Sequence, residues 1–141
     1  MHRKTLVALL GAIVIAVAAS GVAFAAGSGP AVSVTIKTAT KTLLQTTTHG
    51  EKGWITKGGT PKGQCSGNTA AGALDAATHG KWTAKYYPGV TGGVFVTSIL
   101  GVKPKGQSAF WELIVNGKSA SKGVCEIKLH TGEKIGFKLV G

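Results

Sequence analysis

The sequence predicts an α+β fold with one helix packed across a mixed β-sheet, and three features support this prediction. Apolar runs at residues 32–37 and 41–48 have the pattern of strands. Residues 69–79 carry apolar side chains at helical spacing. The last third of the chain then shows three strand patterns, which lie at residues 109–115, 125–129 and 134–140. A helix between two sets of strands is typical of a two-layer domain.

The first 25 residues are predicted to be a secretory signal peptide. A basic start is followed by an uncharged apolar run and by Ala23-Phe24-Ala25, which has the small-residue pattern of a cleavage site. The alternative is an uncleaved anchor, because residues 6–26 are just long enough to cross a bilayer. We expect residues 26–31 to be a linker and residues 32–141 to form one domain. The mature protein is then secreted or extracellular, at the cell envelope.

The first two strands are expected to pair as a hairpin. Val32, Val34 and Ile36 alternate with polar residues, and residues 41–48 combine leucines with β-branched threonines. Residues 50–63 follow as a loop rich in glycine and lysine, with Trp54 in its middle. A loop of this length is often functional. Trp54 is therefore a candidate contact residue, and the alternative is that its ring packs on the rim of the sheet.

Residues 69–79 form the predicted helix. Its apolar face is mostly small, with Ala70, Ala73, Leu74 and Ala77 at helical spacing. Asn68 or Thr69 suits the N-cap, and Gly80 is placed to end the helix. Small side chains allow the helix to lie close to a sheet. Gly72 weakens the helix by about 1 kcal/mol relative to alanine, so tertiary packing must hold it.

Five further segments are expected to be extended. Residues 81–87 alternate Trp82, Ala84 and Tyr86 with Thr83, Lys85 and Tyr87, and residues 94–99 are rich in β-formers. Residues 109–115 are apolar on both alternations except at Glu112, so we expect them at the centre of the sheet. Asn116-Gly117 predicts a type I′ turn. Residues 125–129 and 134–140 follow, and in the latter Ile135, Phe137 and Leu139 share one apolar face.

Cys65 and Cys125 are predicted to form a disulfide, because both belong to the exported part and lack the spacing of a redox pair. A closed loop of this length stabilises the folded state by about 4 kcal/mol in the chain-entropy model. The alternative is a metal site with histidines. His49, His79 and His130 stand at no ligand spacing with a cysteine, so no metal is expected.

The charge of the mature chain is strongly positive. Of sixteen basic residues, removal of Arg3 and Lys4 leaves fourteen, all of them lysines, against five acidic residues. Recognition of phosphate or of guanine favours arginine, whose planar guanidinium group can make two parallel hydrogen bonds. The lysines also do not cluster with aromatic residues. Nucleic acid is therefore not an expected partner. The lysines are expected to be a solvated surface, or to give weak attraction to anionic wall polymer or lipid headgroups.

Catalysis is not expected. The acids are dispersed and no nucleophile elbow, zinc-binding helix motif or phosphate-binding glycine loop accompanies them; they are Glu51, Asp75, Glu112, Glu126 and Glu133. An enzyme would require Glu112 to lie in a pocket beside a histidine or lysine, and the cysteines cannot be nucleophiles once bonded to each other.

The element order indicates a β-grasp, and several segments carry a family resemblance. They are Thr69-Ala-Ala-Gly-Ala-Leu74, Phe95-Val-Thr-Ser-Ile99, Phe110-Trp111 leading to Val115-Asn-Gly-Lys118, and Leu129-His-Thr-Gly-Glu-Lys-Ile135. Residues 32–140 resemble the transcobalamin C-terminal-like domain, also called DUF4430. In the vitamin carriers this domain closes over a corrinoid that a separate helical barrel holds. That barrel is absent from this sequence, so corrinoid binding does not carry over and no ligand-contacting residue transfers by motif. No cofactor is expected, and cobalamin is an alternative that rests on the resemblance alone.

Two functional hypotheses follow. The first is a secreted, monomeric, noncatalytic binding or adhesion module at the cell envelope, with Trp54, Tyr86 and Tyr87 as exposed contacts and cell-wall polymer as partner. The second is a carrier of a small, planar, amphipathic, corrinoid-like ligand held against Trp82 and Trp111. A contiguous aromatic cleft would favour the carrier, and core packing in that space would favour the module. Contact with a membrane is expected only through an uncleaved leader.

Overall fold

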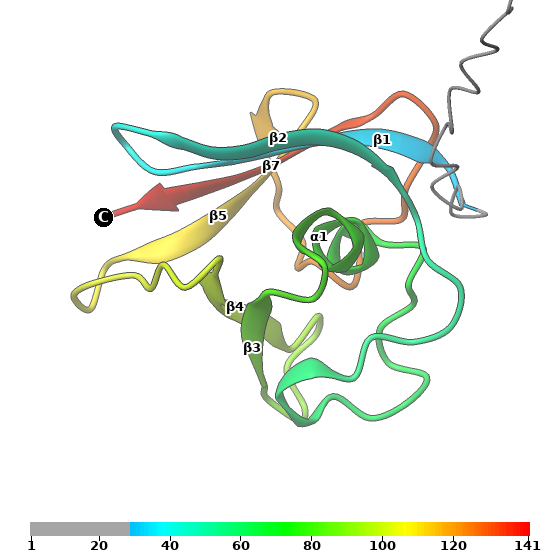
Figure 1. Ribbon diagram of the computed structural model, residues 1–141. Coiled ribbons are helices and arrows are strands. Elements are labelled where there is room, and N and C mark those ends of the chain that lie inside the picture. The colour runs from blue at the N-terminus through cyan, green and yellow to red at the C-terminus, as the bar shows by residue number, and fades with distance from the viewer. Residues whose placement is uncertain (1–28) are drawn as a thin grey trace, which may run out of the picture.

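Figure 1 shows two β-sheets and one α-helix in the computed structural model, which describes residues 29–141. The predicted leader and the first part of the predicted linker lie outside the described residues. Helix α1 spans Ala70–Thr78 and a short 3₁₀ turn, η1, spans Lys57–Gly59. The strands are β1 (Ala31–Lys37), β2 (Thr42–His49), β3 (Trp82–Tyr86), β4 (Val94–Ile99), β5 (Phe110–Val115), β6 (Lys118–Ser119) and β7 (Lys134–Val140). The predicted α+β class is confirmed.

The larger sheet has the strand order β2-β1-β7-β5-β6. Strands β1 and β7 pair in parallel, and the other pairs are antiparallel. Two hairpin-like units thus meet through their inner strands, and α1 lies across one face of the sheet (Figure 1). This arrangement is the predicted β-grasp. Among residues 29–141, no helix is both long and apolar enough to span a bilayer.

The core forms where the apolar faces of β1 and β7 meet the helix. Val34 lies opposite Ile135 and Ile36 opposite Phe137 in the parallel register. All four side chains are at most 1% exposed, and Leu74 of α1 packs in the same cluster. The alternation predicted for residues 32–37 and 134–140 is therefore confirmed.

The centre of the sheet is β7, and the placement of residues 109–115 there was wrong. Strand β5 is followed by the short edge strand β6. Trp111 and Leu113 of β5 are buried, whereas Phe110 on the opposite face is 54% exposed. Glu112 lies on that outer face opposite Lys138 and accepts a hydrogen bond of 2.6 Å from Ser119 Oγ. The apolar outer residues of β5 therefore do not mark a strand covered on both faces.

Residues 125–129 are not a strand, contrary to the prediction, because their backbone caps the helix. The amide of Ala70 donates to the carbonyl of Ile127 at 2.9 Å, and the amide of Ala71 donates to that of Val124 at 3.0 Å. Thr69 is the N-cap residue but its side chain makes no cap hydrogen bond. The first amides of a helix lack partners within it, and here a distant segment supplies the carbonyls.

The other turns are close to expectation. Asn116 and Gly117 both have positive φ, at 51° and 81°, as a type I′ turn requires. Helix α1 ends at Thr78, and His79 takes the left-handed conformation one residue before Gly80. The smaller sheet pairs β3 with β4 in antiparallel register, with a bulge beside Thr83.

Candidate functional site

The two tryptophans expected to hold a planar ligand lie in the core. Trp82 is 2% exposed and Trp111 is 7% exposed. The indole nitrogen of Trp82 donates to Asp75 Oδ1 at 2.6 Å, and that of Trp111 donates to the carbonyl of Val102 at 3.3 Å. Core side chains thus cover the rings and the polar edges are paired, so the two side chains do not line a common aromatic cleft.

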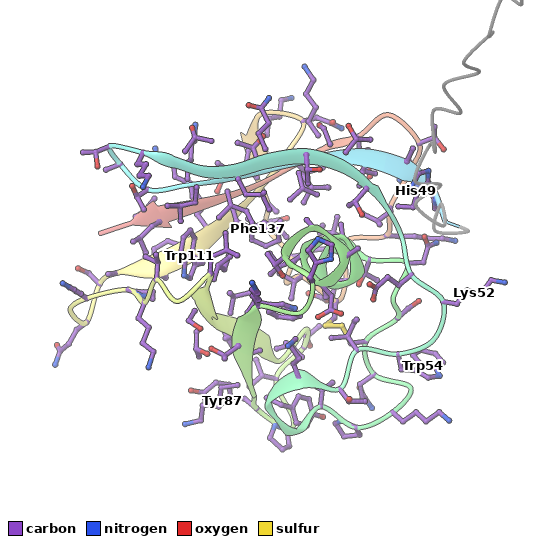
Figure 2. The ribbon with its side chains drawn as sticks, in the orientation of Figure 1. His49, Lys52, Trp54, Tyr87, Trp111 and Phe137 are labelled. Carbon is purple, nitrogen blue, oxygen red and sulfur yellow. A yellow bond between two sulfur atoms is a disulfide. The ribbon has the colours of Figure 1, made fainter. Side chains whose placement is uncertain are left out.

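The other three candidates differ in exposure. Trp54 is 47% exposed and Tyr87 is 40% exposed, whereas Tyr86 is partly buried against the core. The backbone of Trp54 pairs with that of Ser66, outside the large sheet. Figure 2 shows Trp54 and Tyr87 at the end of the molecule away from β1 and β2, with Lys52 nearer to the end of β2.

Five exposed side chains share one face of the small sheet, which we name the β3–β4 outer face. Alternate residues of a strand point to the same side, and Lys85 lies directly opposite the aromatic residue of β4. The face consists of Thr83, Lys85, Tyr87, Phe95 and Thr97. It lies on the side opposite the buried Trp82 and Val94.

The aromatic part of this face is ordered by its own contacts. The rings of Tyr87 and Phe95 meet edge to face, with centroids 5.3 Å apart and an interplanar angle of 82°. The ammonium of Lys85 lies 4.9 Å from the centroid of Tyr87. Phe95 is nevertheless 50% exposed. These contacts hold the rings in place while leaving much of their surface to a ligand.

A chain of hydroxyl groups continues the face. Thr83 Oγ1 lies 2.7 Å from Thr97 Oγ1 and 2.5 Å from Ser98 Oγ. The bulge beside Thr83 makes this possible, because two residues of one strand then oppose one residue of the other. Ser98 is buried and anchors the chain of hydroxyls, whereas the two threonines reach solvent.

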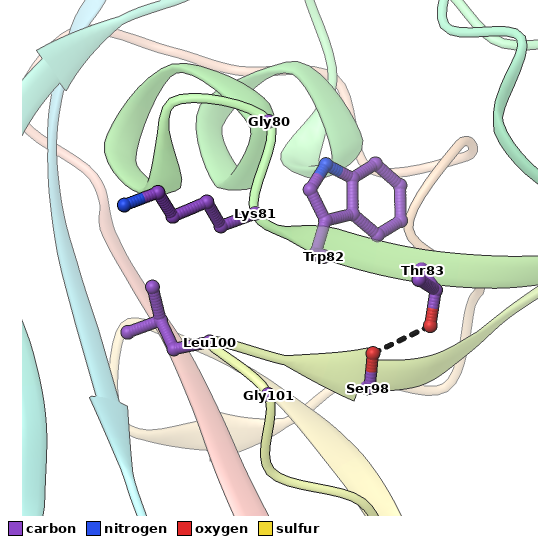
Figure 3. Close-up of a pocket in the computed structure, with 7 residues that line it drawn as sticks. All are labelled: Gly80, Lys81, Trp82, Thr83, Ser98, Leu100 and Gly101. Carbon is purple, nitrogen blue, oxygen red and sulfur yellow. Dashed lines mark hydrogen bonds between the residues drawn. The ribbon is translucent and has the colours of Figure 1, made fainter.

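A shallow pocket opens next to these hydroxyls, beside the end of α1 (Figure 3). Its volume is about 530 Å³ and it is open to solvent. Lys81 and Leu100 extend toward the same side in Figure 3, while the indole of Trp82 turns away from them. The lining residues are Gly80, Lys81, Trp82, Thr83, Ser98, Leu100 and Gly101. The pocket offers one cationic side chain and a small apolar wall.

A polar cluster joins the loop of residues 50–63 to α1. Lys57 Nζ donates to the carbonyl of Gly80 at 2.7 Å and lies 3.8 Å from Asp75 Oδ1. The same ammonium lies 5.3 Å from the centroid of a Trp82 ring. Burial raises the pKa of Glu51, and the charge of Asp75 and a hydrogen bond with Asp75 raise it further. Lys57, Asp75 and Trp82 satisfy one another and fasten the loop.

The predicted disulfide is confirmed, since Cys65 and Cys125 are bonded. Within residues 29–141, no three His, Cys, Asp or Glu side chains are grouped so that they could hold a metal ion.

Sequence reasoning missed Phe95 and Thr97 as members of the outer face. The signal was present, because polar Thr83 and Lys85 alternate with buried residues of β3, and an antiparallel partner must continue the same exposed side. The register that brings Phe95 opposite Lys85 was not readable from either strand alone.

Comparison with known proteins identifies one family. The model of a family described as "Domain of unknown function (DUF4430)" matches residues 67–141. No curated protein matches.

Two solved structures share the fold. A proposed metal-binding protein from Ruminococcus gnavus ATCC 29149 matches with a TM-score of 0.57 at 10% identity, over 79% of this chain and 96% of that protein. Haptocorrin in complex with Cbi matches with a TM-score of 0.58 at 16% identity, over 83% of this chain. The chain spans 26% of the haptocorrin chain. At these identities the likeness concerns the fold.

Proposed function

The chain belongs to the DUF4430 family, and its fold is that of the transcobalamin C-terminal-like domain. We propose that it is a noncatalytic binding module that acts outside the cell, at the envelope. The fold neighbours include a proposed metal-binding protein and a haptocorrin complex with Cbi, so this framework is compatible with a binding role. The disulfide is compatible with an oxidising compartment. We expect the module to act as a monomer.

The observation that carries the proposal is the exposed aromatic cluster of Tyr87 and Phe95. Large exposed aromatic residues bordered by polar ones mark binding surfaces. Their edge-to-face contact, together with Lys85, fixes the rings before any ligand arrives. A surface ordered in advance loses little conformational entropy on binding. Trp54, about half exposed and close in sequence to Lys52, extends the same end of the molecule.

The acidic side chains support a noncatalytic role, because four of the five accept hydrogen bonds within the fold. Asp75 accepts from Trp82, and Glu112 accepts from Ser119. Glu126 accepts from the amide of Gly123, and Glu133 from the amide of His130. Glu51 lies against Asp75. Carboxylates used in this way close turns and fasten elements.

The test is retention of the purified mature domain by isolated cell-envelope fractions. A double variant, Tyr87→Ser with Phe95→Ser, should bind about tenfold less tightly, because a few aromatic anchors dominate such contacts. The control is Phe110→Ser, which removes an aromatic ring that is 54% exposed but belongs to the large sheet. Equal retention of the double variant and the control, or no retention of the unmodified domain, would overturn the proposal.

The second candidate is a carrier of a small amphipathic molecule, and the pocket beside Trp82 favours it. Its Lys81 and Leu100 offer one charge and one apolar contact. Against it, the faces of Trp82 and Trp111 are covered. Titration with cobalamins tests this function, because a carrier would change the absorption spectrum of the corrinoid, whereas the binding module would leave it unchanged.

A further inference from the structure

We propose that the β3–β4 outer face binds an acidic polysaccharide, and this inference rests on the binding role proposed above. The sugar rings lie against Tyr87 and Phe95, the anionic group meets Lys85, and the sugar hydroxyls bond to Thr83 and Thr97. Each part of this assignment comes from a different property of the face: its shape, its hydroxyl groups and its charge.

The shape of the face suits an extended chain of sugar rings. Thr83 and Lys85 of β3 are followed by Tyr87 just after the strand, with Phe95 and Thr97 beside them on β4. Side chains on one face of a strand repeat about every 6.6–6.8 Å, twice the rise per residue. Such a surface offers contact along an extended polymer.

The hydroxyl groups of the face have unused hydrogen-bonding capacity. The three hydroxyls of Thr83, Thr97 and Ser98 carry three donors, and two contacts link them. One donor and several lone pairs are left, and both threonines are exposed. Sugar hydroxyls are donors and acceptors at once, so they can extend this chain in either direction.

The charge selects an anionic ligand. Lys85 is the one ionisable cation of the face, none of the five acidic residues belongs to it, and no carboxylate of the described residues lies within 4.0 Å of its ammonium. The ammonium is also held beside the ring of Tyr87. Lys85 and Tyr87 can therefore contact the anionic group and the ring of the same sugar. The fourteen lysines of the mature chain add long-range attraction. A nucleic acid would instead favour arginine and several cations along the face.

The experiment measures binding of the mature domain to polygalacturonate, with dextran, poly-L-glutamate and phosphatidylglycerol vesicles as comparison ligands. Polygalacturonate should bind most tightly, because dextran lacks the charge and poly-L-glutamate lacks the sugar. Lys85→Gln should weaken this binding about tenfold, as for loss of one charge-assisted hydrogen bond, and Lys85→Arg should restore most of it. Thr83→Val with Thr97→Val should weaken binding of polygalacturonate while leaving binding of poly-L-glutamate unchanged.

The matched control is Lys37→Gln, which removes the same charge from an exposed position on β1. Equal effects of Lys37→Gln and Lys85→Gln would show nonspecific attraction and overturn the inference. Equal or tighter binding of poly-L-glutamate or of the vesicles would also overturn it. If polygalacturonate fails while envelope fractions still retain the domain through Tyr87 and Phe95, the ligand class is wrong and the binding role stands. Failure of both removes both proposals.

Discussion

Two carboxyl groups, Glu51 and Asp75, meet where the loop of residues 50–63 touches α1. Asp75 is held there by the indole of Trp82 and by Lys57. No cation of residues 29–141 forms an ion pair with Glu51. Burial, followed by the charge of Asp75, raises the pKa of Glu51 above the ordinary 4.5. The folded protein therefore holds the proton of Glu51 more tightly than the unfolded chain does.

This residue should give the protein a pH-dependent stability. A raised pKa in the folded state means that the contribution of Glu51 is fully present below pH 4.5 and is lost as the pH rises through the folded pKa. Glu51→Gln imitates the protonated side chain, so we expect the variant to have a higher Tm at pH 7 than the unmodified protein. Thermal melts followed by circular dichroism from pH 4 to pH 7 should show the gap widening with pH.

The background variant Asp75→Asn provides the control for this prediction. It removes the neighbouring charge while an amide oxygen can still accept from Trp82. Glu51→Gln should then raise the Tm at pH 7 by a smaller amount. A gap that is the same at every pH, or a lower Tm for Glu51→Gln at pH 7, would contradict the assigned cause.

At the scale of single residues, exposure was only partly predictable from the sequence. Trp54 and Tyr87 are exposed, as the binding hypothesis required, but Trp82 and Trp111 pack in the core. Strand alternation says which residues share a side and leaves open which side meets the helix. That choice depends on how β3 packs against the rest of the fold. Phe95 could be placed on the exposed side only through its register with Lys85, and that register was not readable from the sequence.

At the scale of elements, sequence patterns predicted correctly those strands and turns that local interactions determine. Alternation found β1 and β7, and residue chemistry found the type I′ turn after β5. The pattern failed at residues 125–129, whose alternation suits a strand, because the amides of Ala70 and Ala71 take the carbonyls of that region. It also failed for the sheet centre, because the parallel pairing of β1 with β7 joins segments from opposite ends of the domain.

Gly72 shows how an element depends on a distant backbone. Helix propensity alone predicts that Gly72→Ala stabilises α1 by about 1 kcal/mol. The structure predicts the opposite, since a methyl group there would overlap the backbone carbonyl of Gly67. We expect a net loss of about 1–3 kcal/mol, the usual cost of overpacking. Urea unfolding measures the free energy of unfolding of both proteins.

The matched control for the helix is Ala76→Gly, at a half-buried position of α1. It should lower the free energy of unfolding by about 1 kcal/mol through propensity alone. If Gly72→Ala instead proves more stable than the unmodified protein, the close approach of Gly67 to the helix is wrong.

At the scale of the whole molecule, one disulfide joins two segments that belong to neither sheet. Cys65 lies just after the loop of residues 50–63, and Cys125 lies in the segment that caps α1. The bond spans a sequence separation of 60 residues. It therefore holds the start of α1 against the segment whose carbonyls cap the helix.

Removal of the disulfide should loosen this region before it loosens the large sheet. The double variant Cys65→Ala with Cys125→Ala should lose about 4 kcal/mol of unfolding free energy in the chain-entropy model. Hydrogen exchange locates the effect: the amides of Ala70 and Ala71 bond to the capping segment, whereas the amide of Ser33 bonds to Glu133 beside β7. We expect protection to fall more at the two alanines than at Ser33, because without the bond the capping segment can move away from the start of α1 more easily. An equal fall at all three amides would mean that the bond acts only on the unfolded chain, and the capping segment would then be held by packing alone.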